Sequence, residues 1–158
     1  MCMKDVYTII NDCFNAAVQT ITKFGYNVSN MKPVIDTKAH SSNGNVVQKK
    51  DQIWASSWGE NGVIYINPNY KEVMDYFGVD MIPEHWFTFV IGYQLAKELY
   101  KNQWGSKDKA QIYMKANSDK SFHSLYLDSL NGNAGSVINE ETCCEYFATM
   151  ICRSLGMK

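Results

Sequence analysis

Apolar side chains return every three or four residues along the first segment of the chain. They are Val6, Ile10, Cys13, Phe14, Ala17, Ile21 and Phe24. On a helix this spacing places the apolar side chains along one face, which a globular protein buries in its core. The pattern therefore predicts a helix over Lys4–Phe24. Gly25 follows as its stop, because glycine readily adopts the left-handed conformation found at helix ends.

The next part of the chain alternates short runs of β-branched and aromatic residues with turn-forming residues. Such runs are typical of short strands, and an Asn-Gly pair between them is typical of a tight turn. The expected strands are Pro33–Asp36, Gln52–Ser56 and Val63–Ile66, and the expected turns are Ser41–Asn45 and Gly59–Gly62. The pattern predicts a small mixed or antiparallel sheet.

Helical patterns return after this sheet. Pro83 at the start and Gly105 after the end predict a long helix over Pro83–Trp104, since proline is favoured in the first turn and glycine after the last. Cys144, Phe147, Ala148, Ile151 and Leu155 share one face of a final helix over Asn139–Leu155. Shorter helices are expected at Asn69–Phe77, Lys107–Ala116 and Ser118–Leu130, with a loop at Asn131–Ser136. This order predicts a single α+β domain over residues 1–158.

Composition narrows the class of protein. The 158 residues include 15 Lys and Arg against 16 Asp and Glu, so the cationic excess typical of nucleic-acid binders is absent. No apolar run approaches the roughly 18–20 residues that span a bilayer, and no signal peptide is recognisable. The five cysteines, Cys2, Cys13, Cys143, Cys144 and Cys152, show no CxxC spacing. We expect reduced, buried thiols in a cytoplasmic protein that binds neither nucleic acid nor a membrane.

One segment of the long predicted helix carries a recognisable pattern, Ile91-Gly92-Tyr93-Gln94-Leu95-Ala96-Lys97-Glu98-Leu99. Its apolar frame resembles the active-site helix of zincin metallopeptidases. That helix carries H-E-x-x-H, in which two histidines bind zinc and the glutamate activates the metal-bound water. In this frame Tyr93 takes the place of the first histidine, Gln94 that of the glutamate and Lys97 that of the second histidine.

Two neighbouring segments extend the resemblance over roughly residues 62–150. Gly62–Pro68 is similar to the edge strand that lines the substrate cleft of zincins. Glu141–Ala148 is similar to the later helix that supplies a third ligand, a glutamate, in the gluzincin branch. The closest register puts Cys143 at that ligand position, with Glu141 and Glu145 to either side. The resemblance implies a compact, minimal zincin-like domain.

The substituted residues change the chemistry that this helix can perform. A neutral phenol is a poor zinc ligand, an amide cannot accept the proton of a water, and an ammonium repels a divalent ion. We therefore expect no catalytic residues at Tyr93, Gln94 and Lys97, and no zinc cofactor. We hypothesise instead that Lys97 forms an ion pair with Glu141 or Glu145. The alternative is that Lys97 is a solvated residue on an amphipathic helix.

These expectations lead to one expected function and to one alternative function. The resemblance implies an inactive zincin-like pseudopeptidase that binds another protein, as a bacterial or phage-encoded inhibitor of a host factor. Its expected contact surface is aromatic and consists of Trp54, Trp58, Tyr65, Trp86 and Trp104. The rival is an active zinc metallopeptidase with non-standard ligands, drawn from His85, Glu98, His123, Glu141 and Glu145.

Four residues with reactive side chains are expected to have structural roles. His85 is expected at the surface or as a helix cap, and His123 as a packed or exposed histidine on a short helix. Of the adjacent thiols Cys143 and Cys144, one is expected to face the core and the other the cleft.

Overall fold

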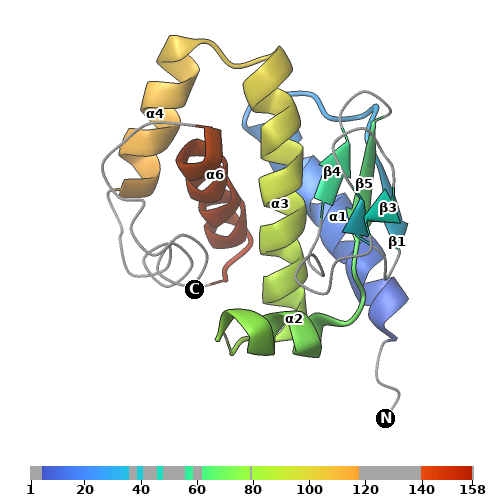
Figure 1. The fold of residues 1–158 in the computed structure, drawn as a ribbon. Helices are drawn as coiled ribbons and strands as arrows, with labels where there is room; N and C mark the ends of the chain where they lie inside the picture. Colours follow the sequence, from blue (N-terminus) through green and yellow to red (C-terminus); the bar gives the residue numbers. More distant parts are fainter. Residues whose placement is uncertain are drawn as a thin grey trace.

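A computed structural model describes residues 5–35, 39–40, 46–47, 56–58, 62–78, 80–117 and 140–157 (Figure 1). Helix α3 (Pro83–Asn102) stands between helix α6 (Glu140–Ser154) and the sheet, and it also contacts helix α1 (Val6–Lys23) (Figure 1). Every residue from His85 to Gly92 is buried, because neighbours cover this part of α3 on all sides. A helix that is apolar all round is suited to such a central position. The predicted α+β class is confirmed.

The sheet packs beside α3 and has the strand order β1-β5-β4. Strand β5 (Val63–Ile66) pairs in parallel with β1 (Lys32–Ile35) and antiparallel with β4 (Ser56–Trp58). Two short strands, β2 (Ala39–His40) and β3 (Val46–Val47), form a separate antiparallel pair. Because β5 is hydrogen-bonded on both sides, it is a middle strand. It is not the free edge strand that the zincin resemblance implies for Gly62–Pro68.

The predicted elements agree closely with the described ones where a nearby residue, such as a helix cap or a glycine, marks their ends. Helix α1 begins after Asp5, whose carboxylate accepts a hydrogen bond from the Thr8 N–H at 2.9 Å. Helix α2 (Tyr70–Phe77) ends at Gly78, which is left-handed with φ of 69°. Helix α4 (Ser106–Asn117) includes the predicted Lys107–Ala116. The predicted turn at Ser41–Asn45, helix at Ser118–Leu130 and loop at Asn131–Ser136 lie outside the described residues. Most of the predicted strand Gln52–Ser56 and turn Gly59–Gly62 also lie outside them.

Two predicted helix ends were wrong. Helix α3 stops at Asn102, because Gln103 leaves the helical conformation and its side chain binds the backbone of Asn27. Helix α6 stops at Ser154, and the left-handed Gly156 (φ 82°) turns the chain there. Leu155 is therefore 38% exposed instead of completing the buried face of α6. Among the described residues, no helix combines the length and apolarity needed to cross a membrane.

Candidate functional site

The segment that resembles the zincin motif lies on α3, where this helix packs against α6. The two helices approach closely at Gly92, where a Cβ atom would lie 3.0 Å from Ile151 Cδ1 and 3.4 Å from Ala148 Cα. Gln94, one position on from Tyr93, is buried, whereas Tyr93 and Lys97 are half-buried. The Lys97 ammonium lies 5.8 Å from the centroid of the Tyr93 ring, within range of a cation–π attraction.

Cys144 and Glu145 are adjacent on α6, and both are buried. The pKa of the Cys144 thiol is raised, first by burial, and then by the charges of Cys143, Glu140 and Glu145. The positive charge of Lys97 acts on the same thiol in the opposite direction. Lys97 and Glu145 therefore act with opposite signs on the same thiol of α6. The side chain of Glu141 lies outside the described residues.

The residues at this place do not fit a zinc ion. The three motif positions offer a phenol, an amide and an ammonium group, none of which is a good zinc ligand near neutral pH. Within the described ranges, no group of three His, Cys, Asp or Glu residues is arranged to hold a metal. Glu98, which follows Lys97, accepts a hydrogen bond from Asn102 Nδ2 at 2.7 Å.

Two members of the alternative ligand set lie too far apart to bind the same metal ion. His85 and Glu98 are 13 positions apart on α3, which at 1.5 Å per residue separates them by ~20 Å. One metal ion cannot bind both side chains over that span. His123 lies outside the described residues.

Several sequence expectations for side-chain exposure were wrong. His85 is buried, not at the surface, and its burial lowers the pKa of the imidazole. Cys143 and Cys144 are both fully buried, since α4 covers the side of α6 that was expected to face a cleft. Burial raises the pKa of the Cys143 thiol to about 11, an effect that Lys109 opposes. These thiols are suited to core packing rather than to nucleophilic chemistry.

The predicted aromatic contact surface was also wrong in part. Trp86 and Trp104 are buried in the core, so neither can form an exposed patch. Tyr65 is half-buried on β5, while Trp54 and the side chain of Trp58 lie outside the described residues.

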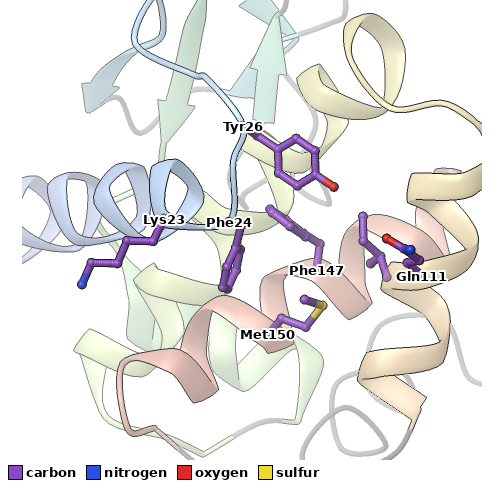
Figure 2. Close-up of a pocket in the computed structure, with 7 residues that line it drawn as sticks. Lys23, Phe24, Tyr26, Gln111, Phe147 and Met150 are labelled. Carbon is purple, nitrogen blue, oxygen red and sulfur yellow. The ribbon is translucent and has the colours of Figure 1, made fainter.

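The structure assembles a different aromatic site, which the sequence pattern did not predict. Phe147 of α6 makes edge-to-face contacts with Phe24, Tyr26 and Trp104, at centroid distances of 5.7, 6.0 and 4.7 Å. Figure 2 shows the Phe24, Tyr26 and Phe147 side chains around a pocket. The volume of this pocket is about 280 Å³. The pocket is lined by Lys23, Phe24, Tyr26, Gln111, Ile112, Phe147 and Met150. We call it the Phe147 pocket.

The end of α1 explains how two of these rings reach the pocket. Gly25 is left-handed (φ 97°), and the Tyr26 and Gly25 N–H groups donate to the carbonyls of Ile21 and Thr22. This double closure is a Schellman motif, which turns the chain directly after a helix. Phe24 and Tyr26 therefore flank one tight turn. The Phe24-Gly25-Tyr26 sequence signals that turn, but nothing in it points to Phe147 far along the chain.

The chain matches no known family model, and comparisons with curated proteins and with solved structures find no match either.

Proposed function

We propose that this protein is a zincin-like domain without peptidase activity, which acts in the cytoplasm by binding another protein. A bacterial or phage origin, with a host protein as the target, completes the proposal and rests on the resemblance to compact zincins. The observation that carries it is the position of Lys97. Its ammonium lies over the Tyr93 ring and within electrostatic reach of the Cys144 thiol, beside the buried Glu145.

A cation at the position of Lys97 can stabilise this part of the protein without zinc. Taking a carboxylate out of water is costly unless hydrogen bonds or an opposite charge compensate it. Lys97 is the basic residue that acts on the same thiol as Glu145, so it is well placed to supply that charge. In this proposal Lys97 stabilises the junction of α3 and α6, and the Phe147 pocket serves recognition.

Metal analysis of the purified protein tests the loss of the zinc site. We expect no stoichiometric zinc after dialysis against a zinc-containing buffer. Stoichiometric zinc in the unaltered protein would instead support the rival, an active metallopeptidase with non-standard ligands.

Restoring the motif tests the zincin resemblance. The triple variant Tyr93→His, Gln94→Glu and Lys97→His should bind zinc in a calorimetric titration. Lys101→His on the exposed face of the same helix is the control and should bind no more zinc than the unaltered protein. A folded triple variant that fails to bind zinc would refute the proposed homology of this site.

A further inference from the structure

We infer that the Phe147 pocket binds a large aromatic side chain of a partner peptide, with an acidic residue of that peptide beside the rim. This inference rests on the proposed function, namely that the protein acts by binding another protein. It adds the site and the chemistry of the bound segment.

The aromatic walls of the pocket are packed against one another. The Phe147 ring is held by edge-to-face contacts with Phe24, Tyr26 and Trp104. The Tyr26 hydroxyl donates a hydrogen bond to Asp108 Oδ1 at 3.2 Å, which anchors its ring to α4. A rigid site pays little conformational entropy when a partner binds, so more of the contact energy appears as affinity.

The size and lining of the pocket favour one large side chain. Its volume of about 280 Å³ lies just below that of small-molecule pockets, which run from roughly 300 to 1,000 Å³. The half-buried rings of Phe24 and Tyr26 offer edges and faces to an aromatic guest, and both pack against the fully buried Phe147 ring. Met150 adds a flexible thioether, which adapts its shape and makes favourable contacts with aromatic rings. Buried aromatic anchors are also the side chains that dominate many protein interfaces.

The charge at the rim of the pocket indicates which kind of residue lies next to the aromatic side chain in the partner peptide. Lys23 lines the pocket through its stem, and Figure 2 shows its ammonium extending away from the rings. Asp108, which holds Tyr26, already accepts hydrogen bonds with both oxygens, from the Tyr26 hydroxyl and the Gly105 N–H. Lys23 is the charged residue of the pocket lining. A neighbouring carboxylate on the partner would complement it.

Selection from a random library of short linear peptides, displayed on yeast, tests this chemistry with the full chain as bait. Recovered peptides should share an aromatic residue with Asp or Glu close to it in sequence. Their affinity is then measured by fluorescence anisotropy against matched variants. Recovery of no peptide, or of peptides without an aromatic residue, would overturn the inference.

Two pairs of variants place the bound peptide. Met150→Trp fills the pocket and should weaken binding at least tenfold, whereas Met150→Leu keeps the pocket open and should change it less than threefold. Lys23→Glu is exposed and should weaken binding roughly fivefold, with little change for the exposed Lys101→Glu. This second pair keeps the test decisive if Met150→Trp does not fold.

The outcome also separates this inference from the proposed function. Peptides that bind both members of each pair equally, but lose affinity in Lys97→Gln, would overturn the Phe147 pocket as their binding site and leave protein binding itself, the proposed function, standing. The zinc measurements test the loss of peptidase chemistry independently of any peptide.

Discussion

Gly92 of α3 lies directly against Ile151 of α6, with only 3.0 Å between the place of a Cβ atom on Gly92 and Ile151 Cδ1. The Ala148 backbone lies on the same side, at 3.4 Å. This glycine sets how closely the central helix and the last helix approach, on the helix that also carries Lys97, whose charge acts on the Cys144 thiol.

Enlarging Gly92 should therefore separate the two helices. We expect Gly92→Val to lower the free energy of unfolding by about 1–3 kcal/mol, because the added methyl groups overpack a buried contact. Urea denaturation measures the change. The control is Gly105→Val, since a Cβ atom on Gly105 meets nothing within 4 Å. Equal effects of the two variants would show that the α3–α6 contact is not tight.

The hydroxyl of Tyr26 should stabilise the protein without being needed for the shape of the Phe147 pocket. Tyr26→Phe removes the hydrogen bond to Asp108 and keeps the ring contacts. We expect a loss of about 0.5–1.5 kcal/mol in thermal or urea unfolding. Tyr26→Leu should cost more, because it also removes the ring contacts with Phe147 and Trp104. An unchanged stability in Tyr26→Phe would contradict a role for this hydrogen bond.

Burial of His85 predicts a pH dependence of stability. Its folded-state pKa is lowered from 6.5 by burial, so the unfolded chain binds a proton more readily than the folded one. Stability from this group is present above pH 6.5 and is lost as the pH falls through the folded-state pKa. The expected slope is at most about 1.4 kcal/mol per pH unit. The variant His85→Gln should show a shallower loss over the same range, and an identical loss would contradict the assignment.

The thiol of Cys143 predicts an effect at high pH. Burial raises its pKa from 9.0 to about 11, so stability is fully present below pH 9.0 and falls as the pH rises toward 11. In this window the unfolded chain loses a proton that the folded protein keeps. Cys143→Ala should flatten that part of the stability curve relative to the unaltered protein. Urea midpoints measured across the window would show the difference, and parallel curves would contradict it.

Elements with local signals were predictable from the sequence. Pro83 marks the first turn of α3, and Gly25 and Gly78 each end a helix in the left-handed conformation. The middle position of β5 was not predictable, because its parallel pairing with β1 joins segments that are distant in sequence. The burial of Trp104 was not predictable either, because it depends on a contact between distant segments. It follows the end of α3 and packs on Phe147, a contact that no local pattern reveals.

The candidate site likewise has one part that was predictable from the sequence and one part that was not. The spacing of Tyr93, Gln94 and Lys97 predicts that the three share one region of α3, and all three are partly or fully buried there. The Phe147 pocket could not be predicted, because its walls come from the end of α1, from α4 and from α6. Its rings meet only through tertiary packing.

A double-mutant cycle on Lys97 and Glu145 tests the central claim most directly. The free energy of unfolding is measured for Lys97→Met, Glu145→Gln and the double variant, with exposed Lys101→Met replacing Lys97→Met in a control cycle. If Lys97 supplies the charge that compensates Glu145, the double variant loses about 1–3 kcal/mol less than the sum of the two single changes. A coupling no larger than in the control cycle would contradict the account.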